Sequence, residues 1–109
     1  MLYDWKPQAV SVKDLIEWPR FFRARSFILE GEYRGWRAKG LGAPVSAGPP
    51  KHRGDWIFRD ETGALYVTGE SPKGLDPITD CGRRIRVEGT CGLTDAKVPY
   101  VRAQTITLL

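Results

Sequence analysis

Cysteine and histidine are scarce in this chain, and their scarcity excludes two kinds of site. The only cysteines, Cys81 and Cys91, stand on either side of a predicted strand, so they do not form a disulfide framework and are interpreted as reduced thiols. A zinc site needs about four ligands. Two cysteines without a CxxC pair and the lone His52 do not supply them. His52 lies in a Gly/Pro-rich segment and is interpreted as a solvated loop residue.

Long apolar runs and catalytic motifs are also missing. No apolar stretch approaches the length of a membrane span. The N-terminal stretch MLYDWKPQAV lacks the basic segment followed by an apolar stretch that marks a secretory signal, so a cytoplasmic location is expected by default. The chain has neither a P-loop nor a nucleophile elbow. We therefore expect no enzymatic activity, no cofactor, no metal and no membrane partner.

Basic residues are concentrated in one part of the chain. Its 109 residues correspond to one domain, and its formal net charge is +4. Between Arg20 and Arg59, nine basic residues stand against three acidic ones, a net charge of +6 that leaves −2 for the remainder. Such a basic half favours polyanions such as nucleic acid or an anionic lipid surface. A solvated surface that keeps the protein soluble explains the charge equally well, so charge alone leaves both open.

The stretch 55–67, DWIFRDETGALYV, has the pattern of a tight antiparallel hairpin. Two short apolar runs, 56–58 and 64–67, flank a polar tetrad that starts with Asp60 and ends with Gly63. The Asp side chain can accept hydrogen bonds from the turn backbone, and Gly can take a positive φ without strain. The other predicted elements can be arranged around this hairpin.

A short helix is predicted before the first strand. Ser11 is a good N-cap, and Asp14 completes an acidic capping arrangement three residues later. Pro19 ends the helix, because the residue before a proline disfavours α geometry. The residues expected on one helical face are Val12, Leu15, Ile16 and Trp18. Residues 1–10 show no clear period and are predicted to be an irregular arm.

From Phe27 the hydrophobic period changes to two, which indicates a strand. Gly31 and Gly35 inside this strand suggest a bulge or a sharp coil. Residues 39–54 are rich in Gly and Pro and form a long loop, which in so small a domain is usually functional or disordered. Residues 70–80 are predicted to be a connector with at most one turn of helix.

Two further strands are predicted, over 83–92 and 99–108, from the alternation of apolar and polar residues. A break in the alternation before Ile106 suggests a bulge near Gln104 or Thr105. The chain is therefore all-β, with five strands and a short helix before the first. Because turns and loops join the strands, the sheet should be largely antiparallel, and five short strands can close only a small barrel filled by side chains.

The order of these segments resembles the OB-fold superfamily, and most closely its anticodon-binding, nucleic-acid-binding type. The matching pieces are FILEG at 27–31, WIFRD at 56–60 with Gly63, GRRIRVEG at 82–89 and PYVRA at 99–103. The resemblance implies a five-stranded Greek-key barrel over residues 27–109. Residues 1–26 are then an arm and helix of the same domain, and the helix is expected to plug one barrel end with Leu15, Ile16 and Trp18.

The resemblance also implies where a ligand would lie. OB folds bind oligonucleotides or oligosaccharides across the second and third strands, between the first-to-second and fourth-to-fifth strand loops. If Leu65 and Val67 point into the barrel, their neighbours Tyr66 and Thr68 point out. The candidate nucleic-acid-binding residues are Arg34, Trp36, Arg37, Lys39, Lys51, Arg53, Ile57, Arg59, Tyr66, Thr68, Lys97, Tyr100 and Arg102.

This mixture of aromatic and basic side chains suits single-stranded nucleic acid. Bases stack on aromatic faces for roughly 1–3 kcal/mol each, and Lys or Arg neutralise phosphates along a groove. Trp36, Tyr66 and Tyr100 are the candidate stacking platforms. Each also has a structural interpretation: Trp36 as a barrel-end plug, Tyr66 as a cross-strand packing partner and Tyr100 as a cover of the barrel end.

We therefore expect a small OB-fold protein that binds single-stranded nucleic acid, with DNA and RNA not distinguished. Two alternatives stay open. One is an OB-like protein-interaction or accessory subunit without nucleic-acid binding, and the other is an oligosaccharide or small-ligand binder. Weak edge strands could also pair between subunits and give a homo-oligomer.

Overall fold

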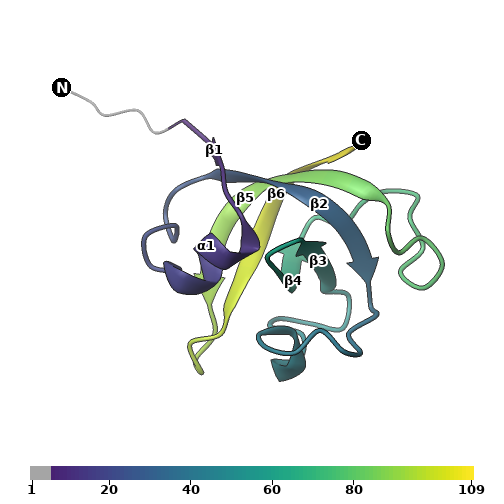
Figure 1. Ribbon diagram of the computed structural model, residues 1–109, viewed down its shortest axis with the longest axis horizontal. Helices are drawn as coiled ribbons and strands as arrows, with labels where there is room; N and C mark the ends of the chain where they lie inside the picture. Colours follow the sequence, from purple (N-terminus) through teal and green to yellow (C-terminus); the bar gives the residue numbers. More distant parts are fainter. Residues whose placement is uncertain (1–5) are drawn as a thin grey trace.

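A β-barrel with a short helix packed against it makes up the computed structural model, which describes residues 6–109 (Figure 1). The elements in chain order are β1 (Gln8–Ala9), α1 (Val12–Glu17), β2 (Phe27–Gly35), the 3-10 helix η1 (Val45–Ala47), β3 (Trp56–Asp60), β4 (Gly63–Gly69), β5 (Arg84–Leu93) and β6 (Pro99–Leu108).

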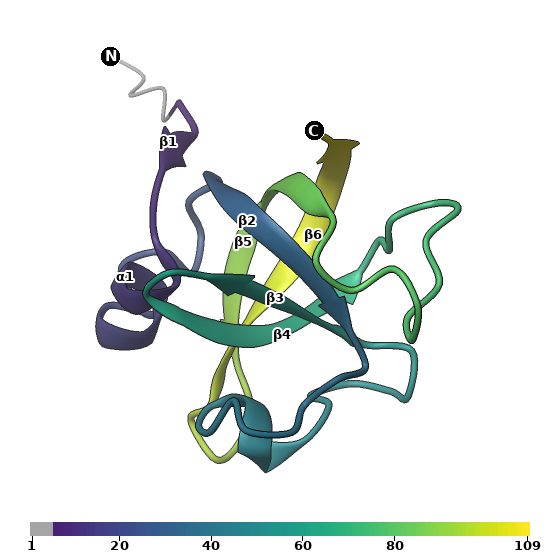
Figure 2. The ribbon, with the colours of Figure 1, turned by 45° about the vertical axis from the view of Figure 1, so that its right-hand side comes forward.

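Strands β2 to β6 close into a five-stranded barrel. Their order is β2-β3-β4-β6-β5, and pairing between β2 and β5 closes the ring (Figure 2). All neighbours in the ring are antiparallel except β4 and β6, which are parallel. The predicted all-β, five-stranded OB-fold barrel preceded by a short helix is therefore confirmed.

Strand β2 serves two neighbours, and its glycines allow this. Residues 27–32 pair with β5, while residues 32–35 pair with β3. A Cβ at Gly31 would collide with the carbonyl of Arg59 on β3. The register with β3 shifts between Tyr33 and Gly35, where Gly35 has a φ of +53°. The predicted irregularity is thus confirmed at Gly35, and it lets one strand belong to both sides of the barrel.

The predicted hairpin is formed by β3 and β4, and Asp60 organises its turn. Asp60 Oδ1 accepts hydrogen bonds from the backbone N–H of Thr62 at 2.8 Å, from its hydroxyl at 2.6 Å and from the N–H of Gly63 at 3.2 Å. Asp60 Oδ2 accepts a further bond from the N–H of Val12 at 2.9 Å. The hairpin turn therefore also holds the first residue of α1.

The helix has the predicted capping box. Ser11 Oγ accepts from the N–H of Asp14 at 3.1 Å, and Asp14 Oδ2 accepts from the N–H of Ser11 at 2.9 Å. The predicted buried face is only partly right. Val12 and Leu15 are fully buried, whereas Ile16 is 38% and Trp18 64% exposed. Because the hairpin turn fixes α1 at Val12, the six-residue helix presents only one narrow stripe to the barrel, and Trp18 lies beyond its end.

The N-terminal arm is more regular than predicted. Gln8 and Ala9 form β1, which pairs in parallel with Phe27 and Ile28 of β2. Two residues are too few to show a period of two, so this strand has no signal in the sequence. The part of the predicted irregular arm at residues 1–5 lies outside the described residues.

The predicted bulge in the last strand is confirmed at Gln104. Thr105 pairs with Glu88, but Ala103 pairs with Gly89, so Gln104 is the extra residue on β6. Residues 70–83 between β4 and β5 contain no helix, in agreement with the predicted connector.

The barrel interior holds the main core, and the alternation of β3 and β4 assigns its members as predicted. Trp56, Phe58, Leu65 and Val67 point inward and pack with residues of the other strands and with Val12 and Leu15 of α1. Each such buried side chain contributes roughly 1.5–3 kcal/mol to stability. A second, separate cluster lies on the outer side of the same two strands.

Candidate nucleic-acid interface

The second cluster occupies the face where an OB fold would hold its ligand. It consists of Val45, Ile57, Ala64, Tyr66 and Tyr100, all buried, and is called the outer cluster below. Ile57, Ala64 and Tyr66 come from the outer face of β3 and β4, and Tyr100 comes from β6. Val45 belongs to η1 in the loop between β2 and β3. The outer face therefore carries Ile57 and Tyr66, as the alternation of residues along these strands implied, but a loop covers it.

The loop that covers this face, residues 36–55, is called the covering loop. Only a few apolar contacts hold it against the outer cluster. Val45 and its neighbour Pro44 are buried, and Ala38 and Leu41 pack partly buried against the cluster. Gly40, Gly42 and Gly48 have φ values of +81°, +67° and +88°, and a Cβ on any of them would meet open space. The loop thus combines a short buried anchor with conformations that suit glycine.

Asp55 fixes the end of the covering loop at the start of β3. Its buried carboxylate accepts from the N–H groups of Lys51 at 2.7 Å and His52 at 3.1 Å through Oδ2. His52 Nε2 lies 3.4 Å from Asp55 Oδ1, and His52 Nδ1 accepts from the N–H of Gly54 at 3.1 Å. A neutral His52 therefore carries its proton on Nε2, while Asp55 Oδ1 is buried and has no hydrogen-bond partner among the described residues. His52 is largely solvent-exposed, as interpreted, and it also closes this turn.

Tyr66 is held as a neutral phenol beneath the loop. Burial raises the pKa of Tyr66 above its ordinary value of 10.0, and the negative charge of Asp55 raises it further. Its ring stays available for packing or stacking, but its hydroxyl is not a base at neutral pH.

Two cations lie close to the ring of Tyr100, where strand β6 meets the covering loop. Lys51 Nζ is 5.5 Å and Arg102 Cζ 5.4 Å from the centre of its ring, within the range of cation–π attraction. Arg102 Nη2 also donates a hydrogen bond to the Tyr100 hydroxyl at 3.1 Å. A Cβ on Gly92 would lie 2.5 Å from Tyr100 Cζ, so glycine at this position leaves room for the ring.

The thirteen predicted site residues separate into three groups. Ile57, Tyr66, Thr68 and Tyr100 are buried, so the expected open platform is not present on this face. The physical reason is the covering loop, which packs Val45, Ala38 and Leu41 against the cluster. The exposed group is Trp36, Arg37, Lys39, Lys51, Arg53, Arg59, Lys97 and Arg102. Arg34 is half-buried.

An acidic residue that the site prediction left out neutralises part of the basic face. Glu32 Oε1 lies 3.7 Å from Arg34 Nη1 and 3.6 Å from Arg59 Nη1. The available signal was the alternation that begins at Phe27, since Glu32 stands between the buried residues Gly31 and Tyr33. Arg34 Nε is buried and has no hydrogen-bond partner among the described residues.

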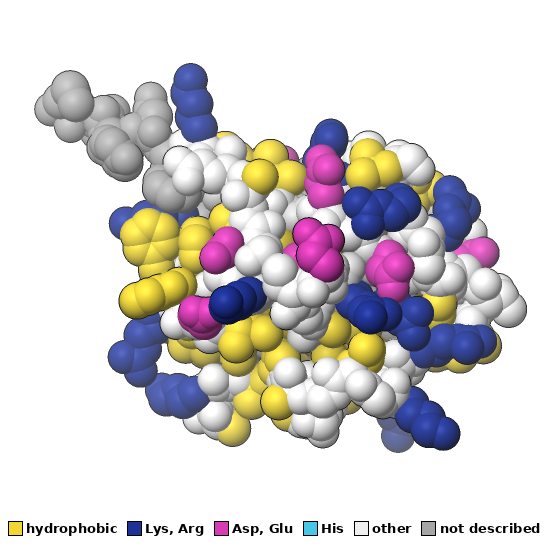
Figure 3. Space-filling view, in the orientation of Figure 1, with side chains coloured by type: hydrophobic (Ala, Val, Ile, Leu, Met, Phe, Trp, Pro, Cys, Tyr) yellow, Lys and Arg dark blue, Asp and Glu magenta, His cyan; other side chains and the backbone are white. Residues whose placement is uncertain are grey.

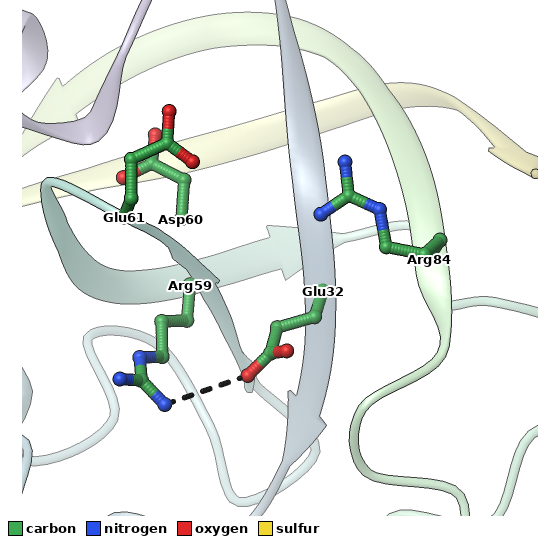
Figure 4. Close-up of a pocket in the computed structure, with 5 residues that line it drawn as sticks. All are labelled: Glu32, Arg59, Asp60, Glu61 and Arg84. Atoms are coloured by element: carbon green, nitrogen blue, oxygen red, sulfur yellow. Dashed lines mark ion pairs between the residues drawn. The ribbon is translucent and has the colours of Figure 1, made fainter.

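A polar groove of about 250 Å³ opens beside this ion pair. Figure 4 shows Arg59 directed at Glu32, and Arg84 across the groove from Glu61 and Asp60. Three acidic side chains stand there against two basic ones, which disfavours a phosphate. In the space-filling view, basic side chains lie around much of the outline and acidic ones nearer its middle (Figure 3). The region around Tyr100 is therefore a better place for an anion than this groove.

Trp36 is the exposed aromatic residue among the three predicted platforms. It is 51% exposed and lines a recess of about 240 Å³ together with Pro72, Leu75 and Pro77. The backbone N–H of Trp36 donates to the Pro77 carbonyl at 3.0 Å. The exposure of Trp36 argues against the alternative of a barrel-end plug, whereas Tyr33 and Trp56, which line the same recess, are buried with their rings 5.2 Å apart.

A further aromatic surface was not predicted. Trp18 and Phe21 are exposed and, with Asp14 and Phe22, line a shallow cleft of about 270 Å³. Arg25 Cζ lies 4.3 Å from the centre of the Phe21 ring. The signal for this surface in the sequence is the run WPRFFRAR at 18–25, in which three aromatic residues are interspersed with three arginines.

Within residues 6–109, no group of three or more His, Cys, Asp or Glu side chains is arranged to hold a metal ion. In the same part of the chain, no helix has the length and apolar character needed to cross a membrane. The sequence matches no protein-family model, and no curated protein is significantly similar to it.

Proposed function

We propose that the protein binds single-stranded nucleic acid at the outer face of β3, β4 and β6, next to the covering loop. One observation carries this proposal: Lys51 and Arg102 flank the Tyr100 ring at the ligand face of an OB-type barrel. An aromatic ring with two cations beside it combines a stacking surface, once the covering loop moves, with phosphate contacts, which is what a single strand requires.

In the closed arrangement, the strand contacts the protein through its phosphates. Lys51 and Arg102 are exposed, and Lys97 in the turn between β5 and β6 adds a third exposed cation. Arg37, Lys39 and Arg53 of the covering loop extend the basic surface. Binding by such contacts is sequence-independent and depends steeply on salt, because bound cations leave the strand.

Stacking on Tyr66 and Tyr100 requires the covering loop to move. Withdrawing Val45 from the outer cluster costs roughly 1.5–3 kcal/mol. Each base that stacks on a tyrosine returns roughly 1–3 kcal/mol. The two quantities are comparable, so a strand that engages both rings can displace the loop.

Fluorescence anisotropy with labelled single-stranded DNA and RNA oligonucleotides tests the proposal. We expect binding at low salt, with an affinity that falls linearly on a log–log plot against salt concentration. Lys51→Ala and Arg102→Ala should each reduce the salt slope by about 0.7, the value for one lost phosphate contact on a single strand. Lys13→Ala and Arg86→Ala are the matched controls, since these residues pair with Glu17 and Glu30 away from the site.

Absence of binding at low salt and micromolar protein would reject the proposal. If the salt slope falls equally in the site variants and in the two controls, the protein binds nucleic acid but not at the proposed site. The two results are distinguishable, because the second leaves a measurable salt slope.

A second candidate function is that of a protein-interaction subunit without nucleic-acid binding. The observation that favours it is the exposed group of Ile16, Trp18 and Phe21 beside α1, since large exposed apolar groups mark contact sites. This candidate predicts that Trp18→Ala weakens association with a partner and leaves oligonucleotide titrations unchanged.

A further inference from the structure

Strand β6 has one edge that is only partly paired. Its first edge pairs with β5 along residues 99–108. Its second edge pairs with β4 at Val101, Arg102 and Ala103, and no described strand continues this pairing beyond Ala103. In Figure 2 the C-terminal end of β6 stands clear of β4.

The backbone groups that face this open edge can be assigned. The N–H of Leu109 donates to the carbonyl of Arg84 on β5 at 3.0 Å. In an antiparallel pair, alternate residues direct their N–H and C=O groups to the same neighbour. Thr105 and Thr107 therefore bond to β5, and the groups of Ile106 and Leu108 face the open edge. An edge of this kind is a template for another strand.

Space for another strand exists beside this edge. A groove of about 380 Å³ runs between β6 and the residues that follow β4. Thr105, Ile106 and Leu108 line one wall, and Glu70, Pro72 and Lys73 line the other. Leu108 is 44% exposed, so the groove wall presents apolar surface as well as backbone groups.

We propose that this edge pairs antiparallel with the same edge of a second copy of the chain, about a two-fold axis at Thr107. Ile106 of each copy then lies opposite Leu108 of the other. Because these two residues carry the open backbone groups, the pairing satisfies both in each copy. Ile106 of one copy contacts Leu108 of the other, and Leu108 of the first contacts Ile106 of the second. This reciprocity is the condition for an isologous interface.

The composition of the edge favours a second copy over a charged peptide. Residues 104–109, QTITLL, contain no charged residue and no proline, the two features that commonly block strand edges. A partner selected by charge would find no charged side chain within this segment. In the two-fold arrangement, Thr107 meets Thr107, and the leucine and isoleucine side chains of both copies gather on one face, which are favourable cross-strand pairs.

Sedimentation analysis over a range of protein concentrations, without nucleic acid, tests this proposal. The interface is small, so the dimer should be weak and should appear as concentration rises into the millimolar range. Thr107→Lys places like charges opposite each other across the axis and should return the mass to that of one chain. Thr107→Glu should do the same, and an equal mixture of the two variants should form a heterodimer. Thr79→Lys, in the exposed connector, is the matched control and should leave the dimer intact.

Hydrogen exchange identifies the edge directly. The amide protons of Ile106 and Leu108 should become slower to exchange as protein concentration rises, whereas that of Thr107 should be slow throughout. A wild-type chain that remains a monomer at millimolar concentration would overturn the proposal. A dimer that survives both Thr107 substitutions, or a mixture of variants that fails to associate, would overturn it as well.

Discussion

Asp60 joins two elements that are far apart in sequence. One carboxylate oxygen organises the hairpin turn, and the other holds the N–H of Val12 at the start of α1. The Thr62 hydroxyl adds a bond from the N–H of Lys13 at 3.0 Å. The turn role follows from the sequence because Asp and Gly are turn residues, but the helix contact spans 48 positions and has no local signal.

The two cysteines should differ sharply in reactivity. Cys91 is buried, and burial raises its pKa to about 11, against the opposing effect of the Arg102 charge. At pH 7 only about one molecule in ten thousand then carries a Cys91 thiolate, the reactive form. Cys81 is half-buried, and its Sγ donates to the carbonyl of Arg34 at 3.0 Å. Iodoacetamide labelling read by mass spectrometry should modify Cys81 first and Cys91 only after unfolding.

A Cys81→Ser variant provides the control for this labelling experiment. It should show no rapid modification in the folded state and one modification in urea. Equal labelling rates for the two thiols in the folded wild-type chain would contradict the burial of Cys91 in the inner core.

At the scale of elements, the covering loop controls access to the outer cluster. Val45→Ala removes most of its apolar anchor, so the free energy of unfolding should fall by about 1–2 kcal/mol. If the loop competes with a bound strand, the same substitution should tighten oligonucleotide binding, by up to about tenfold for each 1.4 kcal/mol that opening no longer costs. Urea denaturation and anisotropy titration measure the two effects.

Val87→Ala is the matched control for this experiment. Val87 is fully buried inside the barrel, so the substitution should lower stability without altering access to the outer face. Weaker binding in the Val45 variant, or an equal gain in both variants, would show that loop opening does not limit binding.

The elements that the sequence predicts well are those with a regular period. The hairpin, β5 and the bulge at Gln104 all follow from alternation and turn chemistry. The position of the covering loop does not, because its contact with the outer cluster depends on a few scattered apolar residues in a segment otherwise rich in Gly and Pro. The sequence correctly placed Ile57 and Tyr66 on the outer face of their strands, but whether they are exposed depends on the contact with the covering loop.

At the scale of the whole molecule, the barrel carries three candidate contact surfaces that share no residue. The outer cluster lies under the covering loop, the open edge lies at the end of β6, and the exposed aromatic residues follow α1. The general location of a ligand face was predictable from the resemblance to OB folds. The open edge was foreseen only as a general property of weak strands, because the length of the β4–β6 pairing is set by tertiary structure.

Stability of the whole molecule should decrease in alkaline solution. Burial raises the pKa values of Tyr33 and Tyr66, with additional raising by nearby negative groups, and burial raises the pKa of Cys91 to about 11. The folded state therefore retains protons that the unfolded state releases, starting at the ordinary values of 9.0 for Cys and 10.0 for Tyr. The stability is fully present below pH 9.0 and is lost as pH rises through the folded-state pKa values.

Cys91 alone should account for roughly 2–3 kcal/mol of this loss, at about 1.4 kcal/mol for each pKa unit. Urea denaturation at a series of pH values measures the slope. Cys91→Ala should flatten the curve between pH 9.0 and about 11, whereas Tyr66→Phe should flatten it only above 10.0. A wild-type free energy of unfolding that stays constant or rises over this range would contradict the burial of these groups, because a proton held only in the folded state must destabilise that state when it is removed.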